Sequence, residues 1–290
     1  MKTGKTLRSR RLRRYFSDPW TAAATALLIL LVLACIVVPF FLKYSYKDLV
    51  RDPADGSILL RTPPTAENLL GTDNLGRDML ARLTYGGRFT LGITALATLI
   101  AAVLGGTLGV LSGYRGGRLD FYVMRVVDAL ASIPGLFLAI VMECAMGWGK
   151  GSFVYGLAIA AIAPFAKTVR AAALDVSGKE YIEASRALGA SGFQVMRRHV
   201  VHNVMPVFIV QVVTCLADTL IICTILGYMQ IGINPPTPEW GALFHSGRDF
   251  IRLVPRLTFL PVAAIVLTTV SLNIIGNGLR DSLSTGGGDR

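Results

Sequence analysis

Long runs of uncharged, mostly apolar residues constrain this chain of 290 residues more than any other feature. Trp20–Leu42 contains 23 such residues in a row and Phe89–Tyr114 contains 26, and further runs follow at Gly151–Ala166, Thr219–Pro238 and Leu257–Leu279. About 20 apolar residues in a helix are enough to cross the roughly 30 Å of hydrocarbon in a bilayer. The sequence therefore predicts several helices that cross a membrane, with the lipid bilayer as their surroundings.

Two further apolar stretches, 121–146 and 205–228, contain only isolated charges. Merging all the stretches predicts six spans, at 20–42, 88–112, 123–146, 152–174, 205–227 and 256–277. The fourth span is the weakest, because it has to continue past Lys167 and Arg170 to reach full length. The runs are too continuous for the alternating strands of a membrane barrel. We therefore expect an all-α polytopic membrane protein with six transmembrane helices.

The strong positive charge, +11 in total, would by itself suggest a nucleic-acid partner. Hydrophobic residues make up 53% of the chain, however, and charged residues only 16%, against about 25% in ordinary soluble domains. The composition also excludes a disordered chain, because such chains are poor in apolar residues. We therefore expect no nucleic-acid partner, and the position of the positive charge becomes the informative property.

Seven basic residues and no acid occupy the first 14 positions. By the positive-inside rule we expect the segment 1–19 to be cytoplasmic, and six spans return the tail 278–290 to the same side. The inner segments then carry the whole excess of +11, whereas the outer loops 43–87 and 228–255 each contain as many acids as bases. We expect the first span, 20–42, to be a retained anchor, because a cleaved signal has a shorter apolar core of about 7–15 residues.

The remaining five spans form the predicted core, residues 88–277, which includes the cytoplasmic loop 175–204. Gly105, Gly109 and Gly113 recur every four residues along its first span. Small residues at this spacing permit close contact between helices. The alternative is that these glycines only reflect the high glycine content of membrane helices in general.

The first outer loop, 43–87, is too long for a bare connection between two spans. Thr72 or Asp73 can cap a helix that begins near Asn74 and leads into the second span. The alternative is a solvated loop whose charges only keep it soluble.

The second outer loop contains three prolines within the sequence PPTPEWG at 235–241, and these stiffen the backbone. Thr237 or Glu239 is expected to start a short helix there. Trp240 suits a membrane interface, where an indole ring finds both apolar and polar surroundings.

The inner loop 175–204 has the pattern of two short helices separated by a glycine. Read as a helix, residues 181–188 place Tyr181, Ala184, Ala187 and Leu188 on one side. Gly189 then ends or bends this helix, and a second apolar pattern follows it. The sequence predicts a helix–glycine–helix unit that lies parallel to the membrane surface, with an ordinary surface loop as the alternative.

Ionisable residues inside the spans are candidates for function. Arg125 and Asp128 are three residues apart, and we expect them to form a structural pair. Glu143 lies near the outer end of its span, where its side chain can extend to the interface. Asp218 lies deepest, and it either lines a pathway through the membrane or pairs with a residue of another subunit. His199 and His202 have no third ligand nearby, so no metal site is expected.

Four segments resemble the permease subunits of ABC importers in the dipeptide, oligopeptide and nickel family. EASRALGAS at 183–191 resembles the EAA-type loop, and GTDNLGRD at 71–78 matches the segment before the second span. PPTPEWG at 235–241 and GNGLRD at 276–281 match the segments that flank the last span. The likeness covers about residues 15–283, and these segments in this order on six spans are specific.

The resemblance implies the type I ABC importer permease fold and a set of partners. These are a homologous second permease, two cytoplasmic ABC ATPase subunits and an extracytoplasmic solute-binding protein. The EAA loop would be the coupling helix that contacts an ATPase, through Glu183, Ala184, Ser185, Leu188 and Gly189. The outer loops would dock the binding protein, in segments that contain Asp73, Arg77, Asp78, Glu239 and Trp240.

The resemblance also implies that this chain is not an enzyme and holds no cofactor. It contains no GxxxxGK[ST] motif, so ATP and Mg²⁺ would be bound by the partner ATPases. Peptides are the favoured substrate, nickel or a metal chelate is the alternative, and an ion-coupled carrier that uses Asp218 and Glu143 is more remote. The expected location is the inner membrane of a bacterium. Three positions depart from the family pattern, namely Ser185, His202 and Asn277.

Gly189→Arg and Glu183→Lys are each expected to abolish ATP-driven uptake while leaving folding and membrane insertion intact, because they alter only the contact with the ATPase. Uptake and membrane content would be measured in cells that contain all partner subunits. Normal transport by either variant would refute the coupling role of this loop.

Overall fold

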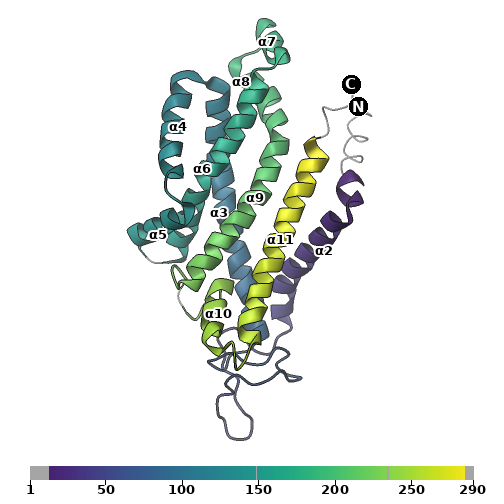
Figure 1. The fold of residues 1–290 in the computed structure, drawn as a ribbon, viewed down its shortest axis with the longest axis vertical. Coiled ribbons are helices and arrows are strands. Elements are labelled where there is room, and N and C mark those ends of the chain that lie inside the picture. Colours follow the sequence, from purple (N-terminus) through teal and green to yellow (C-terminus); the bar gives the residue numbers. More distant parts are fainter. Residues whose placement is uncertain (1–12, 148, 234, 285–290) are drawn as a thin grey trace.

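The apolar runs form helices that lie alongside one another in a bundle (Figure 1). The computed structural model describes residues 13–147, 149–233 and 235–284. Along the chain its helices are α2 (Pro19–Val37), η1 (Val38–Phe40), α3 (Met79–Arg115), α4 (Gly117–Ala131), α5 (Gly135–Met146), α6 (Lys150–Ser177), α7 (Glu180–Ala187), α8 (Gly192–Val195), η2 (Met196–Val200), α9 (Val201–Tyr228), α10 (Trp240–Gly247), η3 (Arg248–Phe250) and α11 (Arg256–Ser284).

Within the residues described, five helical segments are long and apolar enough to cross a membrane. They are Pro19–Phe40, Met79–Arg115, Gly151–Ser177, Gly192–Tyr228 and Arg256–Leu283. The pair α4 and α5 has the required apolar composition when taken together, and counting it as one broken span gives six. The all-α membrane fold is therefore confirmed, with five long membrane helices and the bent pair at the position of the third predicted span.

The third span differs from the straight helix expected at 123–146. It consists of α4 and α5, which meet at 91°. Pro134 stands at the break with an extended backbone, ψ 134°, and precedes the first residue of α5. Proline lacks an N–H and disfavours helical geometry in the residue before it, so the helix cannot continue through this position. The apolar pattern predicted the span but not this bend.

The most extensive contact between two helices is that of α3 with α6, and it includes the three glycines of α3. A methyl group built on Gly109 would lie 2.7 Å from the carbonyl oxygen of Ala166 and 2.9 Å from the amide nitrogen of Arg170. Gly105 and Gly113 face the α6 backbone in the same way. The glycine repeat therefore lets the backbones of α3 and α6 come into contact, and it does not merely reflect the glycine content of membrane helices.

The second span begins earlier than expected. Asp78 caps α3, since its carboxylate accepts a hydrogen bond from the Ala81 amide at 2.7 Å. The predicted helix near Asn74 with a Thr72 or Asp73 cap does not form, because residues 41–78 fold into turns and isolated backbone bridges. One such bridge joins Thr72 to Asp78, so residues 72–78 form a turn immediately before α3.

The described ends of the chain lie at one end of the bundle. The first turn of α2 and the last turn of α11 are at the same end as α7, while α10 and the loop 41–78 are at the opposite end (Figure 1). Gly278 of α11 packs directly on Thr21 of α2. An even number of crossings separates these two ends, in agreement with six spans.

We expect Gly109→Val to lower the unfolding free energy by about 1–3 kcal/mol relative to Gly92→Val, because the added side chain forces α3 away from the α6 backbone. Gly92 lies on the same helix with nothing within 4 Å of an added methyl group, so it controls for the helix propensity of valine. Thermal unfolding in detergent would measure both. Equal melting temperatures would show that the contact adds no stability.

Candidate functional site

The inner loop forms the helix–glycine–helix unit that the sequence predicts. Helix α7 ends where Leu188 donates its amide to Ala184, and Gly189 follows with φ +86°, a conformation that favours glycine. Ser191 then starts α8 with a reciprocal cap, since its hydroxyl accepts from the Gln194 amide and its own amide donates to the Gln194 side chain. Helix α8 continues through η2 directly into α9.

Ile182 anchors α7 to the bundle. Its side chain is fully buried in a cluster with Val176 at the end of α6 and with Val195 and Val200 at the start of the next helices. Burying an aliphatic side chain of this size contributes about 1.5–3 kcal/mol. The loop is therefore attached to both α6 and α9, so a force applied to α7 acts on two membrane spans.

The opposite side of the loop is exposed at the end of the molecule. Glu183 and Ala184 are exposed, Ser185 is half-buried, and Leu188 is 89% exposed. Phe193 on α8 is also exposed. Large apolar side chains left in water beside a small residue are typical of a contact surface for another protein.

Two further contacts fix the loop end of the bundle. The Arg186 guanidinium lies over the Tyr114 ring at 5.2 Å, which joins α7 to the last turn of α3. Arg170 on α6 binds both carboxylate oxygens of Asp120 on α4, with 2.6 Å from Nη2 to Oδ2. Ser112 of α3 donates to the same carboxylate, so the Asp120 side chain connects α3, α4 and α6.

At the other end of the bundle, a buried charge cluster organises the first outer loop. Arg77 and Arg82 both approach the Asp73 carboxylate, at 2.9 and 3.2 Å. Arg82 also reaches the carbonyl oxygens of Tyr46 in the first outer loop and Pro236 in the second, at 3.5 and 3.4 Å. The cluster therefore ties both outer loops to the start of α3.

Glu239 and Trp240 hold the second outer loop from inside. The Glu239 carboxylate caps α10 through the Ala242 amide at 2.9 Å and accepts from the Thr90 hydroxyl of α3 at 3.1 Å. The Trp240 indole donates to the Leu83 carbonyl of α3 at 2.9 Å. Glu239 starts the short helix that the sequence predicts, and Trp240 lies in the protein interior instead of at a membrane interface.

The five outer residues singled out from the sequence are thus all buried, with exposures of 8% or less: Asp73, Arg77, Asp78, Glu239 and Trp240. Buried side chains do not touch a docked protein. They can instead set the shape of the two loops on which a partner would dock.

Two predictions about charges inside the spans are wrong. Asp128 pairs with Lys167 of α6 at 2.8 Å, while the Arg125 guanidinium lies over the Phe121 ring. Glu143 does not extend to the interface but is 1% exposed, with one carboxylate oxygen accepting from the Gly149 amide at 3.2 Å. In both cases the partner lies on or beside α6, which the local pattern of the third span does not contain.

Asp218 lies on α9 with its side chain exposed in this single chain. It is the acid that the sequence assigned either to the transport pathway or to subunit pairing, and its exposure fits both. The sequence reading missed Ile182, Thr90 and Arg82. Ile182 was detectable as the one large apolar residue opposite the side that carries Tyr181, Ala184, Ala187 and Leu188. The other two residues required the positions of distant loops.

Burial raises the pKa of Glu239 to about 7 from its ordinary value of 4.5. Between these values the folded protein keeps a proton that the unfolded chain has released, so the unfolding free energy falls as the pH rises from 4.5 to 7. We expect a fall on the order of 3 kcal/mol from this group, absent in Glu239→Gln. Melting curves of both proteins across this pH range would measure it, and parallel profiles would contradict it.

Comparison with known proteins identifies the family. Residues 105–286 match the family described as binding-protein-dependent transport system inner membrane component. Glutathione transport system permease protein GsiD of Pectobacterium atrosepticum is 32% identical over 93% of this chain and 88% of its own length. Di/tripeptide transport system permease protein DppC of Pseudomonas aeruginosa is 33% identical over 88% and 84%.

Solved structures show the same fold. A chain of the MetNI methionine ABC transporter, in an inward-facing conformation, superimposes with a TM-score of 0.59 at 21% identity, over 71% of this chain and 97% of the matched one. This is the fold of type I ABC importer permeases, as the sequence resemblance implied. The chain belongs to the family of binding-protein-dependent transport system inner membrane components, and it is a permease subunit of an ABC importer.

Proposed function

We propose that this permease moves short peptides across the inner membrane of a bacterium, driven by ATP hydrolysis in partner subunits. The observation that carries the proposal is the identity of the relatives. Permeases named for glutathione, for di/tripeptides and for oligopeptides share 29–33% of their residues with it over about nine-tenths of its length. Nickel remains the alternative cargo from the resemblance, and no contact in the described residues favours it.

The proposed orientation places α7 and both chain termini in the cytoplasm. The excess of basic residues near the N-terminus supports this orientation. Exposed Ala184 and Leu188 would then face an ATPase, with Glu183 beside them to pair with a basic group. Buried Ile182 would transmit the resulting movement to α6 and α9.

The proposed assembly also contains a second permease and an extracytoplasmic binding protein. A second permease is part of the proposal because six spans alone are too few to enclose a peptide-sized pathway. The binding protein would dock on the two outer loops. The shape of these loops is supported by Arg82, which reaches both loops, and by Arg256, which donates to the Leu70 carbonyl at 3.0 Å.

The test is uptake by proteoliposomes that contain this permease, its partner permease, both ATPases and the binding protein. We expect uptake of labelled trialanine only when ATP is present on the ATPase side, because hydrolysis supplies the free energy. Dissipating the proton gradient should leave the rate unchanged.

The matched control uses labelled nickel in place of the peptide, with the same vesicles and binding protein. Nickel uptake with no peptide uptake would refute the proposed cargo. Peptide uptake that follows a proton gradient and ignores ATP would refute the proposed energy source.

A further inference from the structure

One face of α9 is exposed at Val207 and Asp218, partly exposed between them, and polar in the middle. Residues Val207, Gln211, Thr214 and Asp218 are spaced three or four apart, so they lie in a row on one side of the helix. The side opposite this row packs into the bundle through Leu220, Cys223 and Gly227. The polar row is therefore turned away from the protein's own core.

Asp218 stands near the middle of the membrane. It is ten residues from Tyr228 at the outer end of the span, or about 15 Å at 1.5 Å per residue, which is half of the roughly 30 Å of hydrocarbon. An exposed carboxyl group at this depth is costly against lipid and is found facing water-filled pathways or other subunits. The face that carries Asp218 is thus unsuited to lipid.

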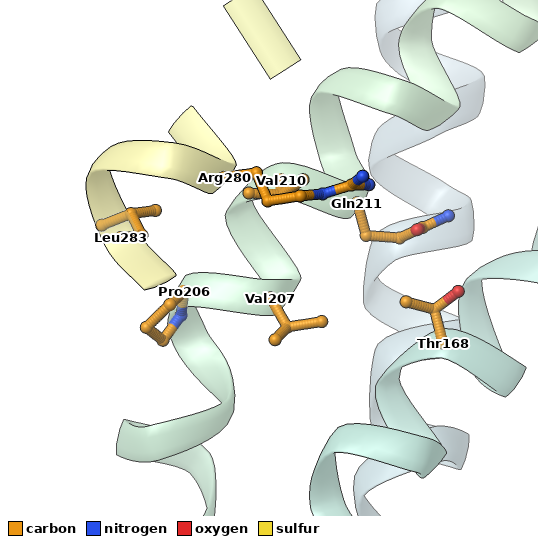
Figure 2. A pocket seen from close by; sticks show the side chains of 7 residues that line it. All are labelled: Thr168, Pro206, Val207, Val210, Gln211, Arg280 and Leu283. Carbon is orange, nitrogen blue, oxygen red and sulfur yellow. The ribbon is translucent and has the colours of Figure 1, made fainter. Parts of the chain in front are cut away.

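A cavity of about 140 Å³ opens on the same face towards the inner end of the bundle. Gln211, Arg280 of α11 and Thr168 of α6 contribute its polar groups, and Figure 2 shows all three side chains around the same space. Pro206, Val207, Val210 and Leu283 complete its lining. The Thr168 hydroxyl donates to the Pro164 carbonyl at 3.0 Å, so the donors free in the cavity are the Arg280 guanidinium and the Gln211 amide. A guanidinium beside an amide forms a donor set that suits a carboxylate.

The polar side chains at the two ends of this face have no partner among the described residues. Among residues 13–147, 149–233 and 235–284, the side chains of Asp218, Gln211 and Arg280 form no hydrogen bond or ion pair. A negative group and a positive group are therefore both available, at different depths along one face.

The spacing between the two groups matches a short peptide. Gln211 and Asp218 are seven residues apart on one helix, which is about 10.5 Å along its axis. An extended peptide spans about 3.3–3.6 Å per residue, so three residues cover about 10–11 Å. The free termini of a tripeptide, one positive and one negative, would reach both ends of this row.

We propose that the polar face of α9 is a cargo subsite for short peptides, with Asp218 binding the N-terminal ammonium group, and with Arg280 and Gln211 in the cavity binding the C-terminal carboxylate. The inference rests on the proposed peptide function and adds the groups that recognise the cargo. It assigns to Asp218 a contact with cargo instead of with the second permease.

The test uses the complex of both permeases and both ATPases in lipid nanodiscs, without the binding protein, so that selection by that protein does not enter. Binding of labelled trialanine would be compared with binding of N-acetyl-trialanine and trialanine amide. We expect the wild-type complex to bind trialanine at least tenfold more tightly than either blocked peptide, because each block removes one terminal charge.

Asp218→Asn should remove the discrimination against the acetylated peptide, and Arg280→Gln should remove the discrimination against the amide. Asp218→Glu should restore part of the first effect. Asp55→Asn and Arg118→Gln make the same chemical changes at exposed positions away from this face, and they should bind like wild type.

Equal binding of free and blocked peptides by wild type, or no binding of trialanine, would overturn the subsite. Separation of the two permeases in Asp218→Asn, measured by size-exclusion chromatography, would assign Asp218 to subunit pairing and also overturn it. Uptake of trialanine by the same complex together with its binding protein shows independently whether the proposed peptide function stands.

Discussion

The contact between the α3 and α6 backbones is the constraint on which the rest of this molecule depends. Glycine at 105, 109 and 113 lets two long helices approach at backbone distance over two full turns. Helix α3 is 37 residues long and reaches from the outer loops to the inner loop. The three glycines fix α3 against α6 near its C-terminal end, and both ends of α3 carry polar groups that join it to other segments.

Those polar groups are mostly internal. Asp120 and Arg170 join α4 to α6, Asp73 lies between two arginines, and Glu239 joins α10 to α3. A buried charged or polar group must be paired or hydrogen-bonded to offset its lost hydration, so each of these groups fixes the relative positions of the elements it joins. In this chain the buried charged side chains near the outer loops hold the loops in position. The shape of the loop surface that a partner would meet depends on these internal contacts.

The sequence predicted the helices better than their contacts. Six spans followed from apolar runs, because a bilayer demands a minimum length of apolar helix. The start of α3 was missed because Met79–Gly87 contains polar residues that are buried by the outer loops and not by lipid. The bend at Pro134 was hidden inside an apolar run. The inner loop 175–204 was predicted as two helices around Gly189, but the burial of Ile182 depends on α6 and α9, which no local pattern contains.

The segment from α8 to the end of α9 is one continuous helical rod, Gly192–Tyr228, and this has a mechanical consequence. Its 37 residues extend for about 55 Å, and Asp218 lies about 15 Å from the outer end. If the outer end is held by its contacts with α10, the rod is a lever with unequal arms. A sideways displacement of the inner end of the rod is then three to four times larger than the displacement it causes at Asp218. A large movement at the inner loop would therefore produce only a small movement within the membrane.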